Sequence, residues 1–211
     1  MKLVFSICFI FFLFIGTALS TESGNYIIII NGDSVRVNLD MEYTFEDKFD
    51  IDDEVKVKLI QPATLVHEID AYKFSYDRGL SVSCTDIDPT VSQCMLVNTT
   101  GTTCLIQHYE SIDPSMLNLM MLNEVTKESV SYGYEIEREE FKKTLKSGHE
   151  ISGYKATLTY KGDKEEYIVC SYGGKDEGLL IMVSLISIDG ETDQYDLDMI
   201  DKFFDTLEVK M

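Results

Sequence analysis

Short segments in which apolar and polar residues alternate recur along most of the chain, and this period of two constrains the fold more than any other feature. Val55, Val57 and Leu59 alternate with lysines, and residues 154–160 alternate in the same way. Successive side chains of a strand point to opposite faces, so such segments predict strands with one buried face. The 12 tyrosines also favour strands. We therefore expect a fold dominated by β-sheet.

Two segments predict strands of a particular kind. The β-branched run Tyr26–Ile30 is followed by Asn31 and Gly32 and then by the alternating segment 35–39. Asn-Gly tolerates positive φ at both positions and is the strongest short signal for a β-hairpin. The segment Leu179–Ile188 is almost continuously apolar. Such a run is typical of a central strand that is covered on both faces.

A first helix is predicted to begin at Asp113-Pro114. Aspartate is a favoured N-cap, and proline costs little at the first helical position because the N–H there has no intrahelical partner. We expect this helix to end near Glu128 and a strand to follow over residues 130–136. Apolar residues cover most of the helix circumference, which predicts burial on several sides with the methionines as core filler: Met116, Leu117, Leu119, Met120, Met121, Leu122 and Val125.

A second helix is predicted near the C-terminus. Thr192 or Asp193 would cap it, and its buried stripe repeats at helical spacing in Leu197, Ile200, Phe203, Phe204 and Leu207. The fold class that follows is α+β, with a mostly antiparallel β-sheet and two main helices packed on it.

The N-terminal segment predicts export. Lys2 precedes an apolar run over residues 3–15, and Gly16 to Ser20 are mostly small. This three-part pattern is typical of a secretory signal peptide, and the run is short for a bilayer span, which needs about 20 apolar residues. We therefore predict a signal peptide over residues 1–20 and a single secreted α+β domain over 21–211. We expect a secreted or extracytoplasmic location, with no stable membrane anchor after cleavage.

The composition is strongly acidic. The chain has 37 Asp and Glu against 18 Lys and Arg, a formal net charge of −19. Binding to nucleic acid is driven by cationic side chains that displace counterions, so we expect no nucleic acid partner. A negative field suits a basic protein or a cation instead, and it also keeps a protein soluble without any partner.

The cysteines predict disulfides. Cys8 falls in the leader, and four cysteines remain in the mature chain: Cys84, Cys94, Cys104 and Cys170. An even number of cysteines in an exported chain indicates two disulfides, with three possible pairings.

The local pattern favours one of these pairings. Asn98-Thr99-Thr100 has the character of a loop between two short strands. A hairpin symmetric about Thr99 places Cys94 opposite Cys104, near the separation that a disulfide needs. We therefore expect Cys94–Cys104 and Cys84–Cys170, with buried free thiols as the alternative.

No motif for catalysis or for metal binding is present. His67, His108 and His149 form no zinc-site pattern, and the chain has no nucleophile elbow, phosphate loop or dinucleotide fingerprint. We therefore expect no catalytic residue, no cofactor and no metal site. Asn98-Thr99-Thr100 matches the N-glycosylation sequon, which makes Asn98 a possible glycosylation site.

The C-terminal part resembles a known group of folds. A strand led by Gly153-Tyr154 is followed by a return strand, a long apolar strand and a helix that carries Phe203-Phe204. This order resembles the closing βββα segment of the PsbP-like α+β sandwich, over about residues 151–209. The resemblance rests on the order of elements and not on a diagnostic motif. It implies a binding or accessory protein and transfers no catalytic residue.

These observations favour a secreted, non-enzymatic binding or accessory protein whose ligand is not identified. The exposed turns that could bind a partner are the glycine loop Gly173–Gly178 and the acidic stretch Asp47–Glu54. The alternative is an exported hydrolase whose carboxylate and histidine converge only in three dimensions. A pocket that holds His67 or His149 at hydrogen-bond distance from a carboxylate would favour the enzyme. A third possibility is a structural surface component that associates with itself.

Overall fold

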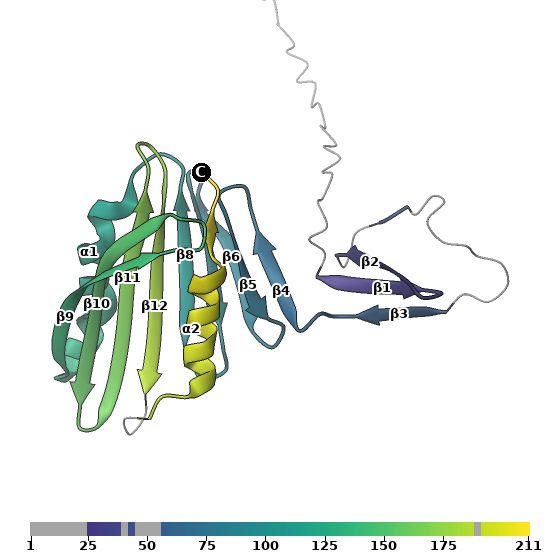
Figure 1. Ribbon diagram of the computed structural model, residues 1–211. Helices are drawn as coiled ribbons and strands as arrows, with labels where there is room; N and C mark the ends of the chain where they lie inside the picture. Colours follow the sequence, from purple (N-terminus) through teal and green to yellow (C-terminus); the bar gives the residue numbers. More distant parts are fainter. Residues whose placement is uncertain (1–24, 39–41, 45–55, 188–190) are drawn as a thin grey trace, which may run out of the picture.

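The structure is a computed structural model that describes residues 25–38, 42–44, 56–187 and 191–211. Within these residues it contains two α-helices, one 3₁₀ helix and thirteen strands, and it confirms an α+β fold dominated by antiparallel sheet (Figure 1). The helical elements are η1 (Pro114–Leu117), α1 (Asn118–Tyr132) and α2 (Gln194–Thr206). The strands are β1 (Tyr26–Ile30), β2 (Asp33–Val37), β3 (Val57–Ile60), β4 (Thr64–Glu68), β5 (Tyr72–Asp77), β6 (Ser81–Asp88), β7 (Val91–Val97), β8 (Thr103–Tyr109), β9 (Glu135–Thr144), β10 (Glu150–Tyr160), β11 (Asp163–Gly173), β12 (Gly178–Ser187) and β13 (Glu208–Val209).

A seven-stranded sheet in the order β6-β7-β8-β12-β11-β10-β9 forms the body of the molecule. Every pairing in it is antiparallel. The apolar strand β12 occupies the middle position, as the sequence predicts. Its Leu179 and Leu180 are both fully buried and contribute to separate hydrophobic clusters, because neighbouring residues of a strand point to opposite faces.

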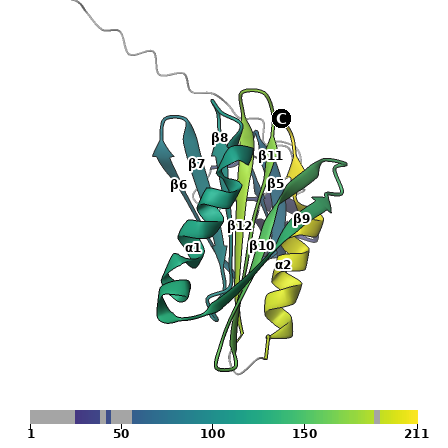
Figure 2. The ribbon, with the colours of Figure 1, turned by 90° about the vertical axis from the view of Figure 1, so that its left-hand side faces the viewer.

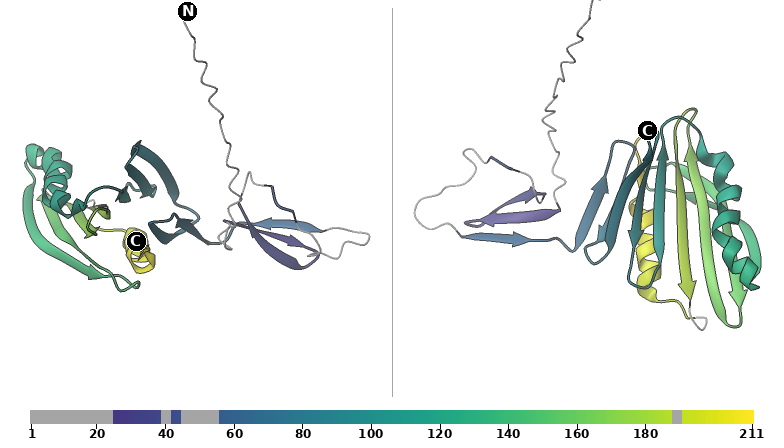
Figure 3. Two further views of the ribbon diagram at one scale, coloured as in Figure 1. Left: turned by 90° about the horizontal axis from the view of Figure 1, so that it is seen from above. Right: turned by 180° about the vertical axis from the view of Figure 1, so that it is seen from behind.

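Different elements cover the two faces of this sheet. Helix α1 packs on one face, where Leu122 meets Ala156, Leu158, Val169 and Leu180. Helix α2 and the three-stranded sheet β13-β5-β4 cover the other face (Figures 2 and 3). The fold is therefore layered, and its larger core lies between the seven-stranded sheet and the layer formed by β4, β5, β13 and α2.

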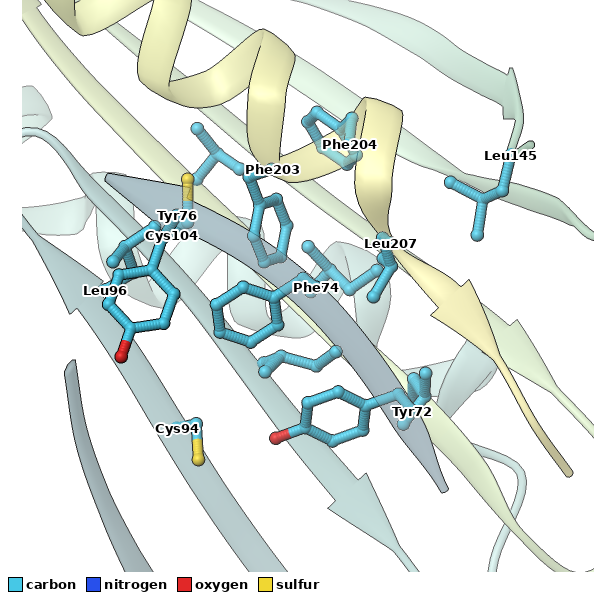
Figure 4. Packing of buried hydrophobic residues seen from close by; sticks show 14 of the residues in the cluster. Tyr72, Phe74, Tyr76, Cys94, Leu96, Cys104, Leu145, Phe203, Phe204 and Leu207 are labelled. Atoms are coloured by element: carbon cyan, nitrogen blue, oxygen red, sulfur yellow. The ribbon is translucent and has the colours of Figure 1, made fainter. Parts of the chain in front are cut away.

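Aromatic side chains of β5 and α2 lie among aliphatic ones in this larger core (Figure 4). The ring of Phe74 on β5 lies 5.2 Å from the ring of Phe203 on α2 in an edge-to-face arrangement, which aromatic pairs prefer. Phe203 also meets Phe204 at 5.4 Å. Phe203 is fully buried and Phe74 is 1 % exposed, so this contact joins α2 firmly to the β4–β5 hairpin.

The N-terminal hairpin has the predicted turn. Strands β1 and β2 pair in antiparallel register, with Ile30 opposite Asp33. Asn31 and Gly32 both have positive φ, at 50° and 104°, as a type I′ turn requires. Strand β3 pairs with the other edge of β1, and this small sheet lies beside β4, away from the seven-stranded sheet (Figure 1).

The second helix begins as predicted, whereas the first begins at Pro114 as the 3₁₀ helix η1, becomes α-helical only at Asn118 and ends later. Asp113 accepts a hydrogen bond from the Ser115 amide, and Asp193 accepts one from the Tyr195 amide. The predicted strand over 130–136 is wrong, because α1 continues to Tyr132 and β9 starts only at Glu135. Gly133 stops the helix by adopting a φ of 102°, which glycine allows without steric cost.

The leader lies outside the described residues, so the signal peptide over 1–20 stays a prediction. Among the residues that are described, none of the helices is both long enough and apolar enough to cross a membrane.

The Phe74–Phe203 contact predicts the effect of a core substitution. Phe203→Ala is expected to lower the free energy of unfolding by about 3–5 kcal/mol, because it leaves a cavity between α2 and β5. Tyr132→Ala is the matched control, since Tyr132 is 73 % exposed, and it is expected to change stability by about 0.5 kcal/mol or less. Urea unfolding of both variants measures the difference. Equal losses in the two would contradict the position assigned to this core.

Candidate functional site

One disulfide is present among the described cysteines, and it is not one of the predicted pairs. Cys84 on β6 is bonded to Cys94 on β7, directly across the β6–β7 ladder. Cys104 and Cys170 are free, buried thiols. The expected bonds Cys94–Cys104 and Cys84–Cys170 are therefore both wrong, and the alternative of buried free thiols holds for two of the four cysteines.

The register of the β7–β8 hairpin explains the first error. The loop is five residues long, from 98 to 102, with the Asn98 amide donating to the Thr102 carbonyl at 3.2 Å. Cys94 consequently pairs with Ile106, and Cys104 pairs with Leu96. A loop of three residues would have set Cys94 against Cys104. With the longer loop, the residue opposite Cys94 is Ile106 instead of Cys104, two positions further along β8.

The order of strands explains the second error. Cys170 lies on β11, four positions from β6 in the sheet, so it is about 19 Å from Cys84 at the usual strand spacing. Cys104 and Cys170 lie on β8 and β11, on either side of β12. Burial raises the pKa of both free thiols, which keeps them protonated and unreactive.

His67 packs against the disulfide, and together these residues form the His67–Cys84–Cys94 cluster. The Nε2 atom of His67 lies 3.2 Å from Cys94 Sγ and 3.8 Å from Cys84 Sγ. His67 belongs to β4, in the sheet that covers the seven-stranded sheet, so the cluster spans two layers. Its donor atoms all lie within 4.8 Å of one another. Cys94 is 5 % exposed, whereas Cys84 is open to solvent on the edge strand β6.

The surroundings of His67 are mainly apolar and aromatic. Its ring lies 5.2 Å from that of Phe74 and 5.9 Å from that of Tyr72. Loss of water around the ring lowers the pKa of His67 below its ordinary value, because burial disfavours the charged imidazolium. The cluster therefore presents a neutral imidazole at physiological pH.

The other two histidines have different environments. His108 Nε2 lies 3.8 Å from Glu177 Oε1, beyond a normal hydrogen bond. His149 Nδ1 lies 3.1 Å from Ser147 Oγ. In the described part of the chain, no histidine is hydrogen-bonded to a carboxylate.

The glycine loop packs against the start of the first helix. A Cβ atom added to Gly173 would lie 2.1 Å from Asp113 Oδ1, and one added to Gly178 would lie 2.4 Å from Pro114 Cδ. These two glycines therefore allow the β11–β12 turn to approach η1 closely. The acidic stretch Asp47–Glu54 lies outside the described residues.

The first helix exposes apolar side chains that the sequence predicts to be buried. Its buried stripe is narrow and consists of Asn118, Leu122 and Thr126. Four apolar side chains face solvent and form what we call the η1–α1 ridge: Met116 (80 % exposed), Met120 (58 %), Leu119 (46 %) and Ile112 (42 %). Residues three and four apart are neighbours on a helix surface, which places Met116 beside Leu119 and Met120, and Ile112 lies just before η1. The predicted burial on several sides is therefore wrong, because α1 lies on the outer face of the sheet and only one side of it is covered.

Acidic residues gather where this ridge begins. Tyr109 pairs with Val91 on one side and with Gly178 on the other, so the β6–β7 turn, the segment 110–113 and the β11–β12 turn meet at one end of the sheet (Figure 2). These segments, together with the last three residues of β6, carry six carboxylates and one cation, Lys175. We call the carboxylates the acidic rim: Asp86, Asp88, Glu110, Asp113, Asp176 and Glu177.

A hollow of about 580 Å³ lies where the N-terminal sheet meets β4 and β5. Acidic and basic side chains line it together, and some already have ionic partners. Lys73 Nζ lies 3.0 Å from Glu208 Oε2, both in the lining, and Glu68 Oε1 lies 2.6 Å from Nζ of Lys210, which is outside the lining. This balance of charge does not select for a ligand of either sign.

Asn98, the possible glycosylation site, is only 9 % exposed. Its Nδ2 donates to Asp196 Oδ1 on α2. Its Oδ1 accepts from the Thr100 hydroxyl at 2.7 Å and from the Thr102 amide at 3.0 Å. The side chain therefore holds the β7–β8 loop in shape and fastens it to α2. A glycan is attached at Nδ2, the atom that this structure directs toward Asp196.

Sequence reasoning did not bring His67 together with the cysteines. The three residues are 17 and 27 positions apart, a spacing that matches no ligand motif, and they meet only because β4 lies over β6 and β7. The methionines of the η1–α1 ridge are visible in the sequence, but their apolar pattern predicts a place in the core. No protein-family model matches the chain, and no curated protein matches it.

The buried imidazole predicts a pH dependence of stability. The unfolded chain protonates His67 near pH 6.5, whereas the folded chain does so only at lower pH. Between these values the unfolded state binds more protons, so stability falls as pH falls below about 6.5. His67→Gln removes this contribution, and the variant is expected to lose less stability than the wild type between pH 7 and pH 5, about the range in which histidine titrates. Urea unfolding of both proteins across this pH range measures the two losses of stability. Equal losses in His67→Gln and in the wild type would contradict the prediction.

The position of Asn98 predicts that the folded protein carries no glycan there. Secretion from a glycosylating host is expected to give the unmodified mass by intact mass spectrometry. Thr100→Val, which destroys the sequon, supplies the reference for an unmodified Asn98. A glycan on Asn98 in protein with native stability would contradict the orientation of Nδ2 toward Asp196.

Proposed function

We propose that this protein is an exported, non-enzymatic binding protein and that its partner is a basic, amphipathic protein segment. The observation that carries the proposal is the η1–α1 ridge beside the acidic rim. Exposed apolar patches with polar borders are typical of protein interaction sites. Methionine is adaptable and is favoured on surfaces that bind amphipathic partners.

The charge of the site determines the kind of partner. A segment with apolar residues on one side would cover Met116, Leu119 and Met120, and cations on its other side would meet the acidic rim. The net charge of −19 adds a long-range attraction for a basic partner and repels nucleic acid and anionic membranes.

The proposal also includes secretion of the protein and a relationship to the PsbP-like group. The apolar leader supports secretion, and the Cys84–Cys94 disulfide supports an oxidising compartment. The order β10-β11-β12-α2 supports kinship with the PsbP-like group, whose members are more often binding or accessory proteins than enzymes.

A designed peptide tests the proposal. The probe is a synthetic amphipathic helix of leucine and lysine, and its counterpart replaces each lysine by glutamate. The leucine–lysine peptide is expected to bind, with an affinity that falls as salt rises, and the glutamate peptide is expected not to bind. Met116→Gln combined with Met120→Gln is expected to weaken binding roughly tenfold, about 1.4 kcal/mol.

The matched control lies at the other end of the same helix. Tyr132→Ser removes an equally exposed apolar side chain and is expected to leave the affinity unchanged. Isothermal titration calorimetry measures the affinity of the leucine–lysine peptide for the wild type, the double methionine variant and Tyr132→Ser. Equal binding by the double variant and the wild type would show that the peptide meets the acidic surface elsewhere, and the proposal would fail.

A further inference from the structure

The His67–Cys84–Cys94 cluster supports an inference that is independent of the proposed binding surface. We propose that it is a thiol-gated metal site: when a dithiol reductant opens the disulfide, the two sulfurs and the imidazole bind a thiophilic cation such as Zn²⁺. In the part of the chain that the structure describes, no other group of three His, Cys, Asp or Glu donors converges in this way.

The donor set suits such a cation. Zn²⁺ prefers thiolate and imidazole ligands in tetrahedral geometry, with Zn–S near 2.3 Å and Zn–N near 2.0 Å. The distances from His67 Nε2 to the two sulfurs, 3.2 and 3.8 Å, are close to the separation of about 3.5 Å between ligand atoms in that geometry. His67 Nε2 therefore lies at ligand separation from both sulfurs.

The disulfide closes the site in its present state. The two sulfurs are bonded to each other, whereas two thiolates on one Zn²⁺ lie about 3.8 Å apart. Cys84 belongs to an edge strand and is exposed, so its side chain has room to turn away from Cys94. Solvent on this side leaves the fourth coordination position to water or to an external ligand.

Once the bond is open, the sulfurs next to the imidazole are those of Cys84 and Cys94. The thiols of Cys104 and Cys170 do not compete, because both are buried and their pKa values are raised.

The opening reaction is a thiol–disulfide exchange. A thiolate of the reductant attacks Sγ of the exposed Cys84, the Cys84–Cys94 bond breaks, and Cys94 leaves with the electron pair. The second thiol of the reductant then displaces Cys84. Two electrons and two protons pass to the protein, and the reductant leaves as a disulfide. Zn²⁺ binding then releases the two thiol protons.

Cobalt provides the spectroscopic test, because Co²⁺ occupies zinc sites and absorbs light according to its ligands. The full secreted chain is reduced anaerobically with a phosphine and titrated with Co²⁺, beside an oxidised sample. The reduced protein is expected to bind one Co²⁺, with thiolate charge-transfer bands and tetrahedral d–d bands that Zn²⁺ abolishes. The oxidised protein is expected to show neither set of bands.

Variants assign the ligands. His67→Ala is expected to weaken Co²⁺ binding by roughly tenfold or more, while His149→Ala, which alters a histidine outside the cluster, is expected to bind as the wild type does. Cys104→Ser combined with Cys170→Ser is expected to keep the thiolate bands. Equal affinity in His67→Ala and the wild type, or the same spectra in the oxidised and reduced proteins, would overturn the proposal.

Circular dichroism accounts for any unfolding on reduction. If the reduced chain loses structure, Zn²⁺ is expected to restore it, because metal binding is then coupled to folding. A reduced chain that unfolds and stays unfolded at millimolar Zn²⁺ would also overturn the proposal.

Discussion

The contact between Phe74 and Phe203 joins two parts of the chain that are far apart in sequence, and the rest of the structure depends on it. It fixes α2 and the β4–β5 hairpin as one layer over the seven-stranded sheet (Figure 4). Because that layer is fixed, His67 meets the Cys84–Cys94 disulfide and Asp196 meets Asn98. Both polar contacts are consequences of apolar packing between layers.

Much of the fold follows from local sequence signals. The turn at Asn31-Gly32, the capping of α2 by Asp193 and the central position of β12 depend on residues close together in sequence, and all three could be predicted. The strand predicted over 130–136 failed because Val130 and its neighbours suit either structure. The helix continues to Tyr132, and the left-handed conformation of Gly133 ends it there.

The candidate sites were harder to predict, for two physical reasons. The disulfide depends on which strands are neighbours and on the length of the β7–β8 loop, which Asn98 sets with its own side chain. The η1–α1 ridge depends on whether a second layer covers α1, and an apolar helix has the same sequence pattern whether or not it is covered. The local sequence pattern therefore does not determine which distant cysteines pair or whether an apolar helix face is exposed to solvent.

The close approach of the β11–β12 turn to η1 has a consequence for the proposed binding surface. Gly173 and Gly178 leave no room for a side chain between the turn and Asp113-Pro114, so Asp176 and Glu177 are carried on a turn anchored at both ends. A surface that is rigid before its partner arrives loses little conformational entropy on association. If the proposed partner binds here, two residues without side chains would thus contribute to affinity while touching no ligand.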